Sequence, residues 1–394
     1  MLAKYVLLAL IALVSSETDD ALLAKAHNHF AVNLLRRLAT ENPSSNVCFS
    51  PTSIAAAFGM AYAGARGSSE AQLSSVLGQT EVGLTDKSRV LKAYKRLLEL
   101  TSSPNVTLEV ANMVLAQENL QVTESYIQQL HDVFDAELRS VDFATDGPKV
   151  ATEVNAWVRD KTRGKIDGIL PENQQLDMVL FIINAVYFKG TWVTKFDPAE
   201  TQNKPFFNLG TTEVSKPAMQ LTSRFPYTRL DALNAAAVEI PYSGAMFSMV
   251  VLLPDYPTEL AALRDGLSLA VLEDVGNKLS SVLVWLRLPK FDMSVRYDLV
   301  PPMRALQLKM VFGDGVNFSG TSPSSPTRIS DAVSKAAVEV NEEGTAAEAV
   351  TGLSITPLAV PPPPVQFTVD RPFLLYIRYR GNNRILFIGK VPSL

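Results

Sequence analysis

The segment 342–364, EEGTAAEAVTGLSITPLAVPPPP, constrains the fold of this chain more than any other stretch. The sequence on either side of it, ISDAVSKAAVEVN before and VQFTVDRPFLLYIRYR after, is strongly β-forming. A connection of this length between two strands is uncommon in a compact domain, and such loops usually carry function. We therefore expect the rest of the chain to form a scaffold that presents this loop.

The N-terminus has the pattern of a secretory signal peptide. Residues 1–16 contain one early cation, Lys4, and then an uncharged apolar run to Val14 that is too short to cross a bilayer. We expect cleavage after Ser16 and a secreted, extracellular product without a membrane partner, folded as a single domain over residues 17–394. A buried helix or a membrane anchor is the alternative interpretation of the same residues.

Composition excludes several classes of protein. The 394 residues are 47% hydrophobic with a net charge of −4, which argues against a disordered chain and against a nucleic-acid-binding protein. Cys48 is the only cysteine, so no intramolecular disulfide can form and a large core has to stabilise the fold. Because Cys48 lies in the apolar run NVCFS, we expect its thiol to be buried.

Hydrophobic periodicity predicts an α+β fold, with helices mostly early in the chain and strands mostly late. Ser50 and Pro51 mark the start of one helix as N-cap and first-turn proline. The nearly apolar run 178–188 predicts a central strand that is covered on both faces. Helices are expected at 19–40, 51–62, 86–100, 124–134, 149–163, 260–278 and 298–310, and further strands at 107–117, 138–143, 225–227, 237–241, 246–253 and 282–288.

Residues suited to catalysis or metal binding are scarce. The three histidines, His27, His29 and His131, lie outside any nucleophile-elbow pattern, and the first two are expected on the surface of their helix. Cys48 has no polar neighbour in sequence that would activate it, and no pair of residues has convincing metal-ligand spacing. We therefore expect no enzymatic activity, no cofactor and no metal.

A set of motifs spread over residues 19–394 resembles the serpin family of serine protease inhibitors. One such motif would be weak, but the set occurs in a single fixed order. The motifs are Asn46…Phe49-Ser50-Pro51-x-Ser53-Ile54, Gly64-Ala65, Asn155-x-Trp157-Val158, Thr162-x-Gly164-Lys165-Ile166, Asn184-Ala185-Val186-Tyr187-Phe188-Lys189-Gly190-x-Trp192, Pro241-Tyr242…Ser248-Met249…Leu253-Pro254, Leu288-Pro289-Lys290-Phe291, Phe318-Ser319-Gly320, Glu339-Val340-Asn341-Glu342-Glu343-Gly344-Thr345 and Asp370-Arg371-Pro372-Phe373-Leu374. The disulfide-free, secreted sequence is similar to arthropod serpins in particular.

The resemblance implies three β-sheets, eight or nine helices, and a reactive loop at about 342–364 that a serine protease attacks as a substrate. It places the scissile bond at Leu358–Ala359, seventeen residues counted from Glu342. It also implies that the serine of the protease forms an acyl-enzyme at the Leu358 carbonyl, after which the loop inserts into a sheet. The implied partner is a serine protease, held covalently by a monomeric inhibitor. The implied loop hinge consists of Glu342, Glu343, Gly344, Thr345, Ala346 and Ala347.

The residues of the loop are suited to insertion as a strand. Alternate residues of a strand face opposite sides of the sheet. The inward set carries no charge, whereas Glu348 falls in the outward set, and Gly344 permits a sharp bend. An alanine-rich helical linker is the alternative, which Gly352 and Pro357 disfavour. The inward set is Thr345, Ala347, Ala349, Thr351, Leu353 and Ile355.

The loop also bears on the class of protease. Residues 344–370 contain no Lys or Arg, whereas the acidic primary pocket of a trypsin-like protease requires a basic residue. With Leu358 as the primary residue, chymotrypsin-, cathepsin G- or elastase-like targets are favoured. A non-inhibitory serpin acting as a carrier, storage protein or chaperone is the alternative, and the small, uncharged inward set argues against it.

The sequence departs from the family pattern at Ser334, where serpins usually have a histidine. In the family that histidine bonds to residues matching Ser53 and Asn184, in a sheet-opening region that here also includes Ser50 and Trp192. Because a serine side chain is shorter, we expect it to span the same gap only through a water molecule. On that basis Ser334→His is predicted to raise the thermal midpoint.

Two further kinds of site are predicted. A basic helical stripe could bind a heparin-like glycosaminoglycan, as serpins that bind heparin do in this part of the chain. The alternative is an ordinary solvated helix face, because Asp86 and Glu99 dilute the charge. Asn105 and Asn317 each begin a glycosylation sequon. The basic stripe consists of Lys87, Arg89, Lys92, Lys95 and Arg96.

Overall fold

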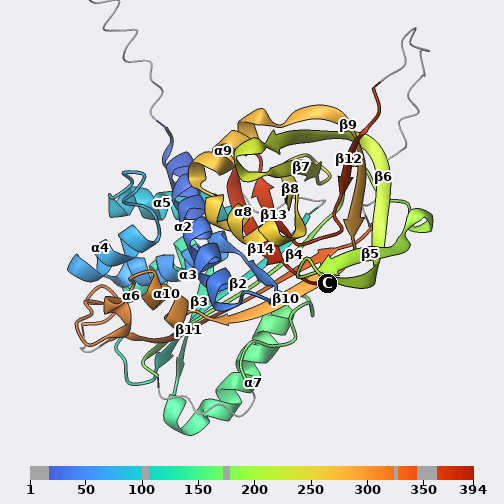
Figure 1. Cartoon of the computed structure of the whole chain (residues 1–394). Helices are drawn as coiled ribbons and strands as arrows, with labels where there is room; N and C mark the ends of the chain where they lie inside the picture. Colours follow the sequence, from blue (N-terminus) through green and yellow to red (C-terminus); the bar gives the residue numbers. More distant parts are fainter. Residues whose placement is uncertain (1–16, 100–105, 172–177, 324–326, 344–361) are drawn as a thin grey trace, which may run out of the picture.

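The computed structural model describes residues 17–99, 106–171, 178–323, 327–343 and 362–394. In these ranges most helices gather at one end of two β-sheets, and one long helix crosses the outer face of a sheet (Figure 1). No helix within the described ranges combines the length and the apolar character needed to cross a membrane.

The first sheet contains β2 (Val106–Gln117), β3 (Ala136–Val141), β4 (Leu180–Gly190), β10 (Phe291–Asp298) and β11 (Ile329–Val340). Its strands lie in the order β10-β11-β4-β2-β3. At its centre β11 and β4 run parallel, and each is antiparallel to its outer neighbour. β4 is buried along nearly its whole length, which confirms the central strand predicted from its apolar sequence.

The second sheet has nine strands in the order β1-β14-β13-β8-β7-β6-β9-β12, with β5 paired to β6. The long strand β6 pairs with β9 along most of its length and with β7 near its end. The resemblance implies three sheets, whereas the described strands form two. The reason is that β6 pairs with β9 on one part and with β7 on another, which joins two of the expected sheets into one. The strands are β1 (Val47–Phe49), β5 (Gln202–Asn208), β6 (Thr212–Leu230), β7 (Ala235–Pro241), β8 (Phe247–Pro254), β9 (Ser280–Pro289), β12 (Val365–Thr368), β13 (Phe373–Tyr379) and β14 (Arg384–Val391).

The described residues contain nine α-helices and four short 3-10 turns. The start of α3 is as predicted, with Ser50 as N-cap accepting a hydrogen bond from the Ser53 amide at 3.2 Å. The helices are α2 (Asp19–Glu41), α3 (Pro51–Gly64), α4 (Gly67–Val76), α5 (Lys87–Glu99), α6 (Glu124–Phe134), α7 (Phe143–Lys161), α8 (Leu260–Gly266), α9 (Leu269–Lys278) and α10 (Val300–Ala305), and the turns are Pro198–Glu200, Asp231–Leu233, Pro257–Glu259 and Met310–Phe312.

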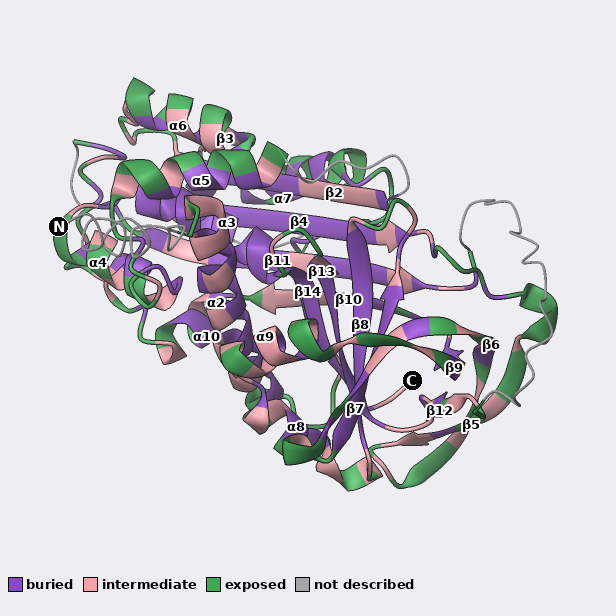
Figure 2. Ribbon diagram, turned by 90° about the horizontal axis from the view of Figure 1, so that it is seen from above, coloured by how far each residue is buried: buried purple, intermediate pink, exposed green. Residues whose placement is uncertain are grey.

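The side chains of β4 show how the layers pack. Ile183 and Ala185 face α7 on one side of the sheet. On the other side, Ile182 packs in the cluster that contains α2 and α3, and Phe188 packs against the second sheet. This alternation follows the two-residue period of a strand. The central strand therefore has a helix on one face, and helices and a second sheet on the other (Figure 2).

Three predicted helices differ from those observed. The single helix expected at 260–278 is two helices, because Ser268 caps a new one by accepting a hydrogen bond from the Val271 amide at 3.2 Å. The helix expected at 298–310 extends only over Val300–Ala305. Helix α7 begins earlier than expected, at Phe143, because Asp142 caps it.

The prediction that His27 lies on the surface is wrong. His27 is fully buried, with its Nε2 atom 3.3 Å from the Tyr94 hydroxyl, because both α5 and β14 pack on α2. Burial, together with the nearby Arg384, lowers the pKa of His27 to about 3. Cys48 is buried as predicted, and burial raises the pKa of its thiol to about 12.

Candidate functional site

The parallel pair at the centre of the first sheet is the seam on which the candidate site is built. Ser334 of β11 lies opposite Asn184 of β4, and Val338 lies opposite Phe188 further along. A segment that leaves the end of β11 and folds back between these strands would run antiparallel to both. Antiparallel pairing is slightly more stable per residue than parallel pairing. The seam is therefore a place where an added strand can increase the number and quality of backbone hydrogen bonds.

A buried polar cluster joins the two strands of the seam. The Ser334 hydroxyl donates to Asn184 Oδ1 at 2.8 Å, and Asn184 Nδ2 donates to Ser53 Oγ at 2.5 Å and to Asn112 Oδ1 at 2.9 Å. All four side chains are at most 4% exposed. Buried polar groups of this kind have to be paired to avoid a desolvation cost. The cluster therefore connects β11, β4, β2 and α3 beneath the seam.

The expectation that Ser334 needs a bridging water to make this connection is wrong. Its hydroxyl contacts Asn184 directly, and Asn184 in turn contacts Ser53. The amide side chain of Asn184 thus carries the connection that one longer side chain would otherwise make. Because the cluster is already complete, the reason for expecting Ser334→His to raise the thermal midpoint no longer holds.

Trp192 lies at a second place, beyond the end of β4 and away from this cluster. Its Nε1–H group donates to the Asn341 carbonyl at 2.8 Å, and its ring stacks on Tyr242 with centroids 4.4 Å apart. Both rings are nearly inaccessible to solvent. The sheet-opening residues predicted from sequence therefore divide into a central cluster (Ser50, Ser53, Asn184 and Ser334) and a terminal contact made by Trp192.

The described part of the hinge is held by charged and polar side chains. Lys290 Nζ lies 2.7 Å from Glu342 Oε2, and the Thr201 hydroxyl donates to Glu342 Oε1 at 2.7 Å. The Glu342 side chain is only 10% exposed. By contrast, the Glu343 side chain is 76% exposed and makes a 3.2 Å ion pair with Lys189. The chain is therefore firmly anchored up to Glu342.

The electrostatics of the hinge depend on two carboxylates. Burial would raise the pKa of Glu342, but Lys290 and Thr201 more than offset that effect, so the pKa is lowered. Burial would also raise the pKa of Glu339. Hydrogen bonds from Lys189 and Tyr187 outweigh this effect, so the pKa of Glu339 is lowered as well. Both groups therefore stabilise the fold as carboxylates.

The rest of the loop, with the predicted scissile bond, lies outside the described residues. This applies to Leu358 and Ala359, to the hinge residues Gly344, Thr345, Ala346 and Ala347, and to the sequon residue Asn105. The two described flanks belong to different sheets, because β11 is in the first sheet and β12 pairs with β9 in the second. Residues 344–361 thus connect two sheets.

The predicted basic stripe is on α5, but its five cations do not form one surface. Arg89 and Arg96 point to α2, where they form ion pairs with Asp19 at 2.5 Å and Asp20 at 2.7 Å. Lys87 pairs with Glu70 at 3.1 Å. Lys92 and Lys95 line a pocket between α5 and α6 and make no ion pair within the part of the chain that the structure describes. Asn317, the other sequon residue, is exposed.

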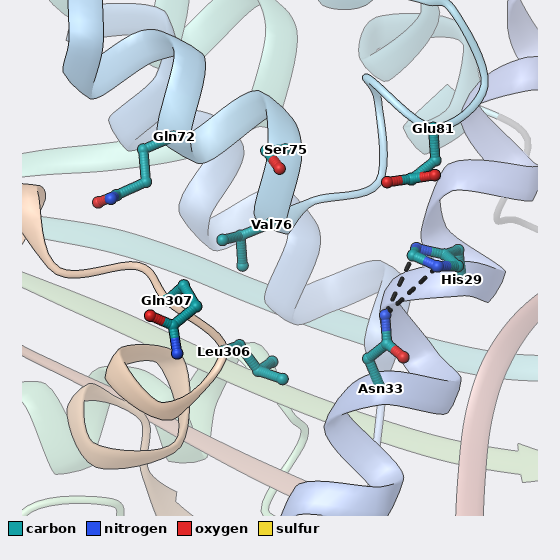
Figure 3. Close-up of a pocket in the computed structure, with 8 residues that line it drawn as sticks. All are labelled: His29, Asn33, Gln72, Ser75, Val76, Glu81, Leu306 and Gln307. Atoms are coloured by element: carbon teal, nitrogen blue, oxygen red, sulfur yellow. Dashed lines mark hydrogen bonds between the residues drawn. The ribbon is translucent and has the colours of Figure 1, made fainter.

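One pocket brings together a serine, a histidine and a glutamate, but not as a catalytic triad. It has a volume of about 470 Å³ and includes Ser75, His29 and Glu81. The His29 ring nitrogens both lie 3.5 Å from the Asn33 amide, and Ser75 lies well away from His29 (Figure 3). Within the described ranges, no group of three His, Cys, Asp or Glu residues is arranged to hold a metal ion.

Several residues of the site escaped the sequence analysis. Asn112 was readable as the one amide in the apolar strand VANMVLA, and such a residue has to find a buried partner. Lys189 and Glu339 belong to two of the serpin-like motifs, but their positions in the sequence do not indicate that they pair with each other. Lys290 was likewise within one of the family motifs, but its position does not indicate that it pairs with Glu342. Thr201 contacts Glu342 from 141 residues away, and no local signal marks it.

Comparison with known proteins agrees with this geometry. The model of the family described as serpin (serine protease inhibitor) matches residues 25–394. Iripin-2 of Ixodes ricinus is 41% identical over 378 residues, which cover 95% of this chain and 94% of the relative. The leukocyte elastase inhibitor of Bos taurus is 34% identical over 379 residues, covering 94% and 99%. The structure of native protease nexin-1 with heparin is similar with a TM-score of 0.83 and 28% identity, over 95% of this chain and 100% of that one. The chain therefore belongs to the serpin family, with arthropod serpins among its relatives.

Proposed function

We propose that this serpin is secreted and inhibits serine proteases by inserting its cleaved loop between β11 and β4. The observation that carries the proposal is the parallel seam, which begins where the loop departs from the sheet. An inserted strand would exchange one parallel interface for two antiparallel ones, and each added backbone hydrogen bond contributes about 1 kcal/mol. Neighbouring strands lie about 4.8 Å apart, so insertion would separate β11 from β4 to nearly 10 Å. The 2.8 Å bond between Ser334 and Asn184 would then have to break.

The proposed target is a protease that accepts an apolar primary residue. Cleavage at Leu358–Ala359 would leave the Leu358 carbonyl bound to the serine of the protease as an ester, with Ala359 supplying the amine that leaves. The absence of Lys and Arg from residues 344–370 disfavours trypsin-like enzymes. The name of the bovine relative, a leukocyte elastase inhibitor, supports an elastase-like target.

The test is incubation of the mature protein with chymotrypsin, leukocyte elastase, cathepsin G and trypsin. We expect a complex stable to denaturing electrophoresis with at least one of the first three, and a released fragment that begins at Ala359. Cleavage of the loop by all of them without a stable complex would exclude the inhibitory mechanism.

The alternative function, a non-inhibitory serpin acting as a carrier, storage protein or chaperone, makes a different prediction about the nicked protein. Insertion should raise the thermal midpoint sharply after the loop is cut, because the sheet gains a strand. A non-inhibitory serpin whose loop stays outside the sheet should keep the midpoint of the intact protein. Heating curves before and after limited proteolysis separate the two.

A second candidate function is the binding of a heparin-like glycosaminoglycan by α5. Lys92 and Lys95, which make no ion pair with the described residues, support it, as does the likeness to protease nexin-1, whose structure contains heparin. The ion pairs of Arg89 and Arg96 with α2 weaken it, since those cations are already neutralised. Retention on immobilised heparin at physiological salt, lost in Lys92→Gln/Lys95→Gln, tests this function.

The remaining proposals concern processing. Removal of residues 1–16 as a signal peptide would release an extracellular protein, and N-terminal sequencing of the secreted product tests the cleavage site. Asn317 is exposed and its Oδ1 atom accepts a hydrogen bond from the Ser319 amide, so a glycan could be attached without disturbing the core. Mass spectrometry tests occupancy at Asn105 and Asn317, and light scattering tests the proposed monomer.

A further inference from the structure

A pocket of about 450 Å³ lies between α5 and α6, next to the end of α3. The two helices lie side by side with exposed outer faces (Figure 2). A volume of this size is within the range of pockets that bind small molecules. It shares no residue with the hinge, the seam or the loop, so any ligand it binds is additional to the inhibitory function.

The lining of this pocket is cationic. Its described lining contains four basic side chains, Arg66, Lys87, Lys92 and Lys95, and no carboxylate. Lys87 is partly neutralised by Glu70, and Arg66 donates to the Ala63 and Ala65 carbonyls rather than to an acid. The pocket therefore presents an excess of positive charge to solvent.

The positions on α5 explain this asymmetry. On a helix, residues three or four apart share a face. Leu91 and Lys95, four residues apart, line the pocket together with Lys92, whereas Arg89 and Arg96 pair with Asp19 and Asp20 of α2. Arg89 and Arg96 are thus paired with acids, whereas Lys92 and Lys95 form no ion pair with any residue that the structure describes. On α6, the pKa of Asp132 is lowered chiefly by its 2.9 Å contact with His131 and only to a lesser degree by Lys95. Asp132 therefore does not form an ion pair with Lys95.

The pocket also has an apolar part. Ala63, Leu91 and Val133 contribute to its lining, and Leu91 and Val133 are only partly buried against the core. A polysaccharide sulfate would use the cations but would gain nothing from these side chains. A molecule with an apolar chain and one anionic group uses both, since removing its chain from water against these side chains is favourable.

We propose that the pocket between α5 and α6 binds an amphipathic anion of the fatty-acid type, with its charged group at Lys92 and Lys95 and its chain along Leu91 and Val133. The pocket in Figure 3 serves as an internal comparison, because it is similar in volume but is lined by Glu81 and by no Lys or Arg among the described residues. The proposal is independent of protease inhibition, and its failure would leave the inhibitory function untouched.

The test is titration calorimetry of the full-length mature protein with decanoate. Acetate, which lacks the chain, and octyl glucoside, which lacks the charge, serve as comparison probes. We expect decanoate to bind about tenfold or more tightly than either, since both interactions contribute. Equal affinity for decanoate and acetate would overturn the apolar half of the proposal, and equal affinity for decanoate and octyl glucoside would overturn the charged half.

Variants locate the site. Lys92→Gln/Lys95→Gln should weaken decanoate binding about tenfold. Arg89→Gln/Arg96→Gln removes the same charge from the same helix, at residues that do not line the pocket and are paired with Asp19 and Asp20, and should change the affinity by less than about twofold. Equal losses in the two variants would overturn the proposed location. As a measurement that needs no variant, decanoate should protect Lys92 and Lys95 from acetylation in mass spectra, and protection by heparin but not by decanoate would overturn the proposal in favour of a polyanion.

Discussion

Lys290 and Glu342 form a 2.7 Å ion pair that ties the point of departure of the reactive loop to the turn between β9 and β10. The carboxylate is nearly buried, whereas the ammonium group remains partly exposed at 38%. Removing the cation therefore leaves a poorly solvated negative charge at the hinge. The stability of the hinge and the stability of the second sheet are coupled through this pair.

We predict that Lys290→Met lowers the free energy of unfolding by about 1–2 kcal/mol, because the nearly buried Glu342 carboxylate loses its partner, although the partial exposure of Lys290 keeps the loss below that of a fully buried pair. Urea unfolding followed by tryptophan fluorescence measures the loss. Lys278→Met is the matched control, since the Lys278–Asp274 pair on α9 has a similar distance of 2.8 Å but is exposed on both sides. A similar loss in both variants would contradict the role assigned to Lys290.

The hinge also predicts a dependence of stability on pH. The pKa of Glu342 is lowered in the folded protein from its ordinary value of 4.5, so the unfolded chain binds a proton more readily. The contribution of Glu342 is fully present above about pH 4.5 and is lost as the pH falls through the lowered value. Thermal midpoints should therefore fall less steeply below this pH in Glu342→Gln than in the wild-type protein. Parallel curves would show that Glu342 does not contribute.

Ser334→Ala should lower the free energy of unfolding by about 1–3 kcal/mol, because Asn184 Oδ1 loses its donor in a buried environment. Ser334→His should give no gain in thermal midpoint, since the cluster is complete and a larger side chain has to displace packed neighbours. Ser294→Ala, at an exposed position of β10, is the control and should be neutral. A clear rise in midpoint for Ser334→His would reinstate the interpretation based on sequence alone.

Leu358→Arg should change the class of protease that is inhibited. The association rate with chymotrypsin should fall, and that with trypsin should rise, by about tenfold or more, because the primary pocket selects the residue before the cut bond. Pseudo-first-order inhibition kinetics measure both rates. Leu353→Arg is the control, because it introduces the same side chain five residues before the predicted scissile bond. It should not confer trypsin inhibition, and if it does, the scissile bond has been placed wrongly.

The parts of the fold that could be predicted from sequence are those set by local patterns. The bounds of α6 follow from its periodicity, and Ser50 with Pro51 identifies the start of α3. The break between α8 and α9 was also readable, because Ser268 is a good N-cap within an apolar periodic run. His27 was misplaced since the pattern of one helix does not reveal how many partners will pack around it.

The site was less accessible because its contacts are distant in sequence. Asn112 and Asn184 lie 72 residues apart, and Thr201 and Glu342 lie 141 residues apart. The resemblance to serpins identified Ser53, Asn184 and Ser334 as a group, but it could not indicate how a serine would be accommodated. That answer depended on the orientation of one amide side chain, which only the three-dimensional arrangement fixes.

The interleaving of strands in the second sheet determines the fate of the molecule once its loop is cut. A break anywhere in residues 344–361 yields two polypeptides, and the shorter one contains β12, β13 and β14. Yet β13 lies between β8 and β14, and β14 also pairs with β1, so the short polypeptide is enclosed by strands of the long one. The pieces should therefore travel as one particle through a sizing column and part only in denaturant. An acylated protease would remain attached to the longer polypeptide, which contains both strands of the seam, β4 and β11.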